Sequence, residues 1–295
     1  MNGPEECKGC GAHLHTGREL LRAALRFARG PQRFALAVLV TVALASLAAG
    51  FIAPSYSEQF RDAISAPPSS RFLLGTDDLG RDRLARLLYG TRVSLLLAPA
   101  AALLSTLLAG LIGGIAGYAG GRWERAVTAG IDLFLSLPWL FLLLAVRALL
   151  PLNTSPLTSV TITFLLLGCL GWASPARIIR AGTRTLANSE FLLEARACGI
   201  PRGRLVWRHL LPNLRPMLLA QFWLSIPVFI LSEANLGLLG LGISEPLPSW
   251  GALLKDLENY TAVLQNPWML APVVLLVAVV SSLQLLLRTE DRAQC

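Results

Sequence analysis

Charged residues are scarce in this chain. Asp, Glu, Lys and Arg make up 15% of its 295 residues, and apolar residues make up 54%. Soluble domains carry about 25% charged residues, so an ordinary soluble domain is excluded. Several apolar runs reach the roughly 20 residues that a helix needs to cross a bilayer.

Lysine and histidine are even scarcer. The two lysines are Lys8 and Lys255, and neither follows glycine in the G-x-x-x-x-G-K pattern of the common nucleotide-binding loop. His209 has no Asp or Cys near it in sequence to make a catalytic pair, and no nucleophile lies beside a base. We therefore expect no catalytic residues, no cofactor and no ATP hydrolysis by this chain itself.

Cysteine is too rare and too dispersed for a disulfide framework, so free thiols are expected at positions 7, 10, 169, 198 and 295. The head CKGCGAHLH brings Cys7, Cys10, His13 and His15 together, and such ligands bind zinc. The histidines are separated by one residue rather than the usual three to five. A disordered tail is therefore the favoured interpretation, with a metal-sensing head as the alternative.

The apolar runs predict an all-α membrane protein with six transmembrane helices. We place these spans at 33–53, 93–119, 127–150, 157–176, 217–241 and 268–287. The first is too long for a signal-peptide core, which favours a retained anchor; cleavage after the small residues near Ala48 is the alternative. Lys and Arg concentrate in the segments that face inward when both termini are cytoplasmic, although the basic residues at 61–92 fit this topology less well.

These spans divide the chain into five parts. They are a cytoplasmic tail at 1–32, an anchor at 33–53, an outer segment at 54–92, a five-helix core at 93–287 with a cytoplasmic loop at 177–215, and a tail at 288–295. Arg18, Arg22, Arg26, Arg29 and Arg33 share one helical stripe, which predicts an amphipathic helix on the lipid surface. Topology and lipid attraction account for the net charge of +8, so no nucleic-acid partner is expected.

The outer segment contains acidic and basic residues that invite a catalytic interpretation. Thr76 or Asp77 is expected to cap a surface-lying helix that leads into the second span. Asp78, Asp82 and Arg81 would then be ion-paired on that helix, which explains them without chemistry.

Small residues and one proline predict features of the second and third spans. Gly110, Gly113, Gly114, Gly117 and Gly121 make overlapping G-x-x-x-G spacings, which favour close helix packing. That contact is either within this chain or with a second subunit. Pro138 is expected to kink the third span.

A few polar residues fall within apolar spans. Glu233 and Asn235 are candidate residues of a translocation pathway, because a charge near mid-bilayer costs roughly 3 kcal/mol and normally faces a bundle interior or a wet cavity. Asp132 and Arg147 receive the same interpretation with less weight. A channel or membrane-embedded enzyme built around Glu233, Asp132 and Arg147 is the alternative function. After the fifth span, Trp250 is expected at the outer interface or in simple packing.

The stretch FLLEARACGIPRGRLVWRHLLPN is the most polar part of the core. Asn188 or Ser189 can cap a helix, Gly199 can end it in a left-handed conformation, and Pro201 can open the next. We expect two short helices that meet at a sharp turn and protrude into the cytoplasm, the second of them ended by Pro212. A rigid, basic-rimmed helix pair suits docking in a groove of another protein.

Three stretches resemble one known family, the permease subunits of binding-protein-dependent ABC importers. The closest resemblance is to the C-type subunit of dipeptide, oligopeptide and nickel systems. The stretches are LGTDDLGRDRLARLLYGTRVSLL (74–96), EARACGIPRGRLVWRHLLPN (194–213) and LGLLGLGISEPLPSWGALL (236–254). The resemblance covers most of the chain, from about Ala66 to Gln284.

The resemblance implies a type I importer fold and defined partners. These are a homologous permease subunit, two ATP-hydrolysing subunits and an external solute-binding protein, in a bacterial or archaeal inner membrane. The 190–213 loop would couple to the ATPase, with contacts from Glu194, Ala195, Arg196, Gly199, Arg204, Arg208 and Pro212. Glu194 lies one position late relative to the family pattern, so that Leu193 stands where the family usually has glutamate. The transported solute is not readable from these residues.

Overall fold

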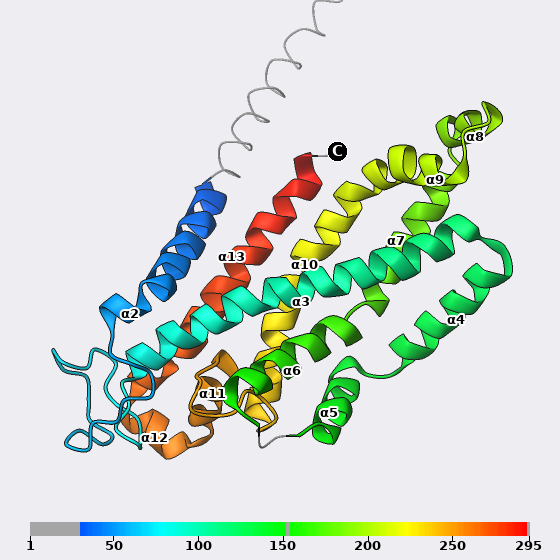
Figure 1. The fold of residues 1–295 in the computed structure, drawn as a ribbon. Coiled ribbons are helices and arrows are strands. Elements are labelled where there is room, and N and C mark those ends of the chain that lie inside the picture. The colour runs from blue at the N-terminus through cyan, green and yellow to red at the C-terminus, as the bar shows by residue number, and fades with distance from the viewer. Residues whose placement is uncertain (1–29, 152–153, 294–295) are drawn as a thin grey trace, which may run out of the picture. The chain divides into compact units, whose positions relative to one another are not determined.

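A computed structural model of the chain describes residues 30–151 and 154–293 (Figure 1). The head, with its alternative zinc ligands, and the basic stripe from Arg18 to Arg29 lie outside the described residues. The chain divides into two compact units, Met1–Val42 with Val277–Cys295, and Ala43–Leu276. The second unit contains every residue of the candidate sites below.

The described part is built from helices. In the first unit these are most of Gly30–Leu47 and the end of α13 (Ala271–Ala293). The second unit contains α2 (Ala49–Ile52), α3 (Arg83–Ala119), α4 (Gly121–Ser136), α5 (Trp139–Leu149), α6 (Pro156–Leu170), α7 (Ala173–Ala187), α8 (Glu190–Ala197), α9 (Arg202–Leu205), α10 (Leu211–Leu238), α11 (Trp250–Lys255) and α12 (Tyr260–Gln265). Short helical turns, η1 (Val206–Leu210), η2 (Asp256–Glu258) and η3 (Pro267–Leu270), complete the list.

Five of the described helical stretches are long and apolar enough to cross a membrane, and α4 with α5 makes a sixth if the bent pair counts as one span. The prediction of an all-α protein with six spans is confirmed. The second span is longer than expected, because α3 begins at Arg83 rather than 93. The fourth span extends through α7, so that Pro156–Ala187 forms one membrane-spanning stretch.

The third span bends more sharply than a kink. Helices α4 and α5 meet at 85° across Leu137 and Pro138, both of which have extended ψ angles. Proline has no N–H to continue the helical ladder and it pushes the preceding residue out of the helical region. The single helix expected over 127–150 is therefore two helices joined at Pro138.

The surface-lying helix expected before the second span is absent, and that prediction was wrong. Residues 53–82 form turns and irregular structure, and α3 then runs without a break into the span. The cap is Asp82, whose carboxylate accepts a hydrogen bond from the Leu84 N–H at 2.9 Å. Thr76 and Asp77 instead bind backbone groups of the irregular segment, which competes with helix formation.

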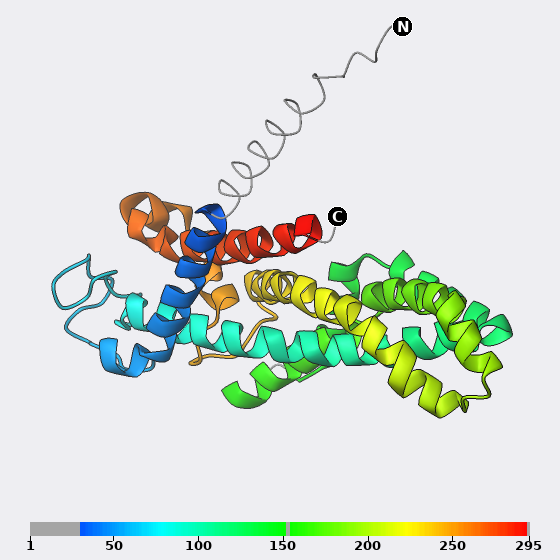
Figure 2. The same ribbon diagram turned by 90° about the horizontal axis from the view of Figure 1, so that it is seen from above.

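Helix α3 packs along both α7 and α10 (Figures 1 and 2). A Cβ added to Gly113 would lie 2.4 Å from the Ala176 carbonyl oxygen, and one added to Gly117 would lie 2.5 Å from that of Arg180. Only glycine allows the two backbones to approach this closely. The contact predicted from the glycine spacing is thus made within the chain at these two positions, whereas a Cβ added to Gly114 would meet nothing within 4 Å.

Candidate functional site

The part of the predicted 190–213 loop that precedes α10 is residues 190–210, which we call the 190–210 loop. It has the predicted shape of two short helices joined by a sharp turn. Helix α8 ends at Ala197, and Gly199 follows in a left-handed conformation with φ of 76°. The Ile200 N–H returns to the Ala195 carbonyl at 3.3 Å, which closes the end of the helix. Pro201 then precedes α9 at its N-cap. In Figure 1 the pair lies at one end of α7 and α10.

An apolar cluster holds this loop against the long helices. Leu192, Leu205, Leu210 and Leu214 are buried together, with Ala195 among the half-buried residues around them. Burial of each such side chain stabilises the packing by about 1.5 to 3 kcal/mol. The cluster therefore fixes the orientation of the opposite, exposed side of the loop.

Six of the seven residues expected to contact an ATPase are exposed, namely Glu194, Arg196, Gly199, Arg204, Arg208 and Pro212. Ala195 is half-buried. Arg196 is exposed but stacks over the Tyr118 ring of α3, with 5.3 Å between the guanidinium carbon and the ring centroid. Arg196 thus has a contact within the chain that ties α8 to α3.

Pro212 does not end the second short helix, which corrects that prediction. Helices α9, η1 and α10 form one continuous stretch, Arg202–Leu238. The turn at η1 is π-helical, and the Leu211 N–H bonds to the Val206 carbonyl five residues back. Pro212 directly follows this wider turn, which lets the stretch continue although proline supplies no N–H.

Trp207 was not identified from the sequence. It lies in the π-helical turn with 74% of its surface exposed, and Leu193 on α8 is 48% exposed. Large exposed apolar side chains on a polar loop are typical of protein contact sites. The sequence did contain a signal for it, because a tryptophan between Arg204 and Arg208 stands outside the spans predicted from the apolar runs.

At the far end of α10, Glu233 is completely buried. The hydroxyls of Ser94 and Ser249 and the backbone of Gly251 lie against its carboxylate, although neither oxygen has a hydrogen bond of good geometry within the described residues. Asn235 is exposed and lies on another side of α10. The structure therefore does not bring the two predicted pathway residues together.

Trp250 is buried inside the protein, so the prediction of an interfacial position was wrong and the packing alternative holds. Its Nε1 donates a hydrogen bond to Thr91 Oγ1 of α3 at 2.9 Å. The next residue, Gly251, packs backbone to backbone on α10, where a Cβ on Gly237 would come 2.2 Å from the Gly251 Cα. These contacts fix α11 to α3 and α10.

An ion-pair network joins the outer segment to the loop after α10. Arg81 and Arg86 both contact Asp77, at 2.7 and 2.6 Å, and both reach Glu245, at 3.0 and 3.3 Å. Asp256 lies 3.6 Å from Arg86. We call these five residues the outer cluster. Of the acids singled out by sequence, Asp82 caps α3 and Asp78 accepts from Ser65, so neither belongs to it.

The pKa values of the outer cluster follow from burial and these pairs. Burial raises the pKa of Asp77, but hydrogen bonds from Arg81 and the charge of Arg86 outweigh it and hold the value below its usual range. The hydrogen bond from Arg81 lowers the pKa of Glu245. Burial raises the pKa of Asp256, with Arg86 opposing it.

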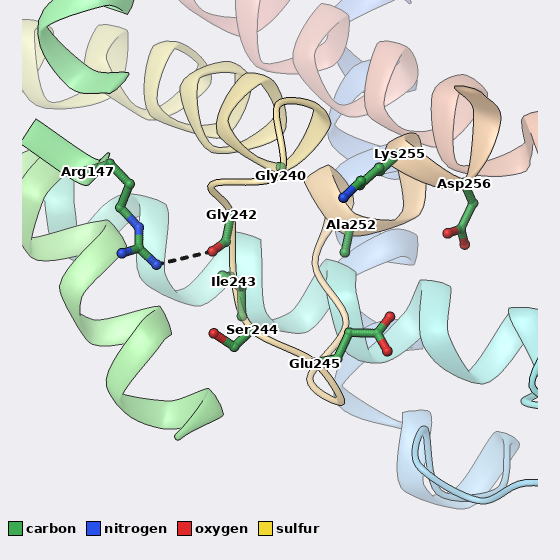
Figure 3. Close-up of a pocket in the computed structure, with 10 residues that line it drawn as sticks. Arg147, Gly240, Gly242, Ile243, Ser244, Glu245, Ala252, Lys255 and Asp256 are labelled. Carbon is green, nitrogen blue, oxygen red and sulfur yellow. Dashed lines mark hydrogen bonds between the residues drawn. The ribbon is translucent and has the colours of Figure 1, made fainter. Parts of the chain in front are cut away.

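Arg147 fixes the wall of a cavity next to this cluster (Figure 3). Its guanidinium donates to the carbonyls of Leu241 and Gly242, at 3.0 and 3.3 Å, and to Ser159 Oγ of α6 at 3.2 Å. The cavity of about 300 Å³ lies between residues 240–245 and α11. Asp132, by contrast, pairs with Arg177 on α7.

Glu233, Asp132 and Arg147 therefore have separate partners and form no common site. Each is held by its own neighbours: small residues and backbone for Glu233, Arg177 for Asp132, backbone carbonyls for Arg147. This arrangement gives no support to the channel or enzyme built around the three.

The long apolar helices define a multi-pass α-helical membrane protein. One of them joins the exposed 190–210 loop to residues that line the polar cavity. Residues 109–292 match the family model of the binding-protein-dependent transport system inner membrane component. The chain belongs to this family, and it is a membrane permease subunit.

Curated relatives extend the match over most of the chain. It is 32% identical to the oligopeptide transport system permease protein OppC of Haemophilus influenzae, over 86% of this chain and 81% of the relative. It is 34% identical to OppC of Bacillus subtilis, over 84% of this chain and 79% of the relative. It is also 34% identical to the di/tripeptide transport system permease protein DppC of Pseudomonas aeruginosa, over 76% of this chain and 75% of the relative.

Proposed function

We propose that this chain forms half of the translocation pathway of an ATP-driven peptide importer in a bacterial or archaeal inner membrane. A homologous permease subunit would form the other half, two ATPase subunits would bind from the cytoplasm, and a solute-binding protein would deliver the peptide from outside. The peptide assignment rests on the names of the relatives, all of which are peptide permeases.

One observation carries the coupling part of the proposal. The stretch Arg202–Leu238 is continuous from the exposed loop to the buried Glu233 and its neighbours. A helix of this kind moves as a unit except at defined defects, here the π-helical turn and the prolines at 212, 216 and 227. Closure of the ATPase pair at the loop would then shift the outer end of α10.

The loop residues have distinct proposed roles. Glu194, Arg204 and Arg208 would contact the ATPase directly, with Ala195, Gly199 and Pro212 shaping the surface. Arg196 would act from within the chain, through Tyr118. Leu193 would offer an apolar contact where the family usually has a glutamate.

Two substitutions test this proposal in the assembled complex. Gly199→Pro would disturb the left-handed turn, since proline cannot adopt a φ of 76°. Arg204→Glu would reverse one exposed charge without touching the buried cluster. Both variants are expected to bind less ATPase subunit and to lose peptide uptake. Stable ATPase binding with normal uptake in both would contradict the proposal.

A further inference from the structure

The cavity beside Arg147 has the size and preorganisation of a small-ligand site. Its volume of about 300 Å³ falls at the lower end of the range for ligand pockets. Its lining includes the backbone of Gly240 and Gly242 and the side chains of Glu245, Lys255 and Asp256 (Figure 3).

Both walls of the cavity are held by buried polar contacts. Arg147, which is fully buried, holds one wall through the carbonyls of Leu241 and Gly242. The other wall is α11, fixed by the Trp250 hydrogen bond to Thr91. Because these walls are already ordered, a ligand that enters the site loses little free energy to ordering the protein, which favours binding.

The acidic residues of the cavity already have counter-ions. Glu245 accepts from Arg81 and Arg86, and Asp256 lies 3.6 Å from Arg86. The charge of Arg83 also acts on Asp256, so that three arginines face the three carboxylates of the outer cluster and compensate their charge. They leave little net attraction for a cationic ligand.

Lys255 differs from these residues. Its side chain extends toward Gly240, where an added Cβ would lie 3.3 Å from Nζ (Figure 3). No carboxylate of the described residues forms an ion pair with it. Arg147, the other cation of the cavity, already donates to backbone carbonyls. The ammonium of Lys255 is therefore the charge that an anionic ligand would meet.

We propose that this cavity binds the carboxylate of the transported solute and that Lys255 contacts it. The inference rests on the proposed function, because a peptide with a free C-terminus carries this group. Gly237 and the residues after α10 line the cavity, and this end of α10 is opposite the 190–210 loop (Figure 1). In the proposed orientation an imported solute would enter from this side. A phosphate group shares the same anionic chemistry, and the test below separates the two.

Amine acetylation tests the contact directly, because the chain contains only two lysines, Lys8 and Lys255. The reconstituted importer, without its binding protein, is acetylated in the presence of trialanine, trialanine amide or inorganic phosphate at equal concentration, and both sites are followed by mass spectrometry. Trialanine is expected to slow the modification of Lys255 about fivefold or more relative to Lys8, and the amide is expected to have no effect. The assignment would be overturned if Lys255 were acetylated equally fast with trialanine and with its amide. It would also be overturned if phosphate protected Lys255 as well as trialanine does.

Uptake kinetics provide a second readout. Lys255→Gln is expected to raise the half-saturating concentration of trialanine about tenfold, whereas Lys255→Arg keeps the charge and stays near the wild type. Arg61→Gln is the matched control, since it removes an exposed positive charge from the outer segment away from the cavity. Wild-type kinetics in Lys255→Gln would refute the site. A wild-type complex without uptake or ATPase activity would instead refute the proposed function.

Discussion

Arg81 and Glu245, which are 164 positions apart, form a two-point ion pair in which Nη1 lies 3.0 Å from Oε2 and Nη2 lies 3.3 Å from Oε1. Arg81 is almost fully buried, whereas the Glu245 side chain is 55% exposed. The pair connects the irregular outer segment to the loop that follows α10.

Charge reversal at this pair is expected to destabilise the outer segment. Arg81→Glu places a carboxylate against Asp77 and Glu245, which should lower stability by about 2 to 4 kcal/mol and reduce the apparent melting temperature of the purified complex. The double variant Arg81→Glu with Glu245→Arg should recover part of the loss. Asp62→Asn is the control, because the Asp62–Arg71 pair is exposed and its loss should change stability by less than about 1 kcal/mol. Equal effects of Arg81→Glu and Asp62→Asn would contradict this account.

Acid is expected to weaken the outer cluster. The hydrogen bond from Arg81 holds the pKa of Glu245 below its ordinary value of 4.5. A carboxylate with a depressed pKa in the folded state stabilises the fold above its unfolded pKa, and the contribution disappears as the pH falls through the folded value. Hydrogen exchange in residues 54–82 should therefore change little between pH 7 and pH 5, after correction for intrinsic rates, and rise below about pH 4.5.

Glu245→Gln separates this effect from other acids. Asp256 has a raised pKa, so its protonation favours the folded state as the pH falls, opposite to the effect of Glu245. Asp256 is present in both the wild type and the variant. The variant should therefore show a smaller acid response than the wild type, together with weaker protection at pH 7. An identical acid response in the two proteins would exclude Glu245 as its source.

The backbone contact between α10 and α11 should tolerate no side chain. Gly251→Ala would place a Cβ 2.7 Å from the Gly237 Cα and 2.8 Å from the Glu233 carbonyl oxygen. Overpacking of this kind costs about 1 to 3 kcal/mol, and it should appear as a lower melting temperature and lower yield of the complex. Gly130→Ala in α4 is the control, since nothing lies within 4 Å of the added atom. A neutral Gly251→Ala would show that α11 can move away from α10.

Glu233 allows a pathway role and an anchoring role to be told apart. If its carboxylate only anchors α11, Glu233→Gln should keep uptake near normal because the amide has the same shape, and Glu233→Ala should lower stability. If it contacts the solute, Glu233→Gln should lower uptake while the melting temperature stays unchanged. Asn235→Ala, at an exposed position of the same helix, tests the second predicted pathway residue by the same uptake assay.

Trp207 is expected to be an anchor of the ATPase contact. Trp207→Ala should weaken the binding of the ATPase subunits by about 2 kcal/mol or more, roughly 30-fold in Kd, as measured by titration of detergent-purified components. Tyr260→Ala is the matched control, because Tyr260 is 72% exposed but lies outside the 190–210 loop. Equal affinities of the two variants would remove Trp207 from the docking surface.

Features encoded in local sequence were predictable. The apolar runs identified the spans, and Gly199 with Pro201 identified the turn of the loop, since only glycine readily adopts the conformation found there. Pro138 marked the break in the third span, but its angle depends on packing that a proline alone does not specify.

Features that depend on distant contacts were not predictable. The outer segment lost its expected helix because Thr76 and Asp77 bind backbone groups and Asp77 pairs with Arg86, which local propensity does not reveal. Trp250 was misplaced because its partner, Thr91, is 159 positions away. The cavity beside Lys255 likewise needs residues from α5 and from the segment after α10, which only the fold brings together.

The central claim is that the 190–210 loop docks on an ATPase subunit, and Cys198 offers a direct test. This cysteine is exposed next to Gly199, so a variant in which the cysteines at 7, 10, 169 and 295 are replaced by serine carries a single thiol at the loop. The complex is expressed with the ATPase subunits and treated with a short amine-to-thiol cross-linker, and the products are identified by mass spectrometry. The account predicts a cross-link from Cys198 to an ATPase subunit in transport-competent membranes. An active importer in which Cys198 is accessible to the reagent, yet never cross-links to an ATPase subunit, would contradict it.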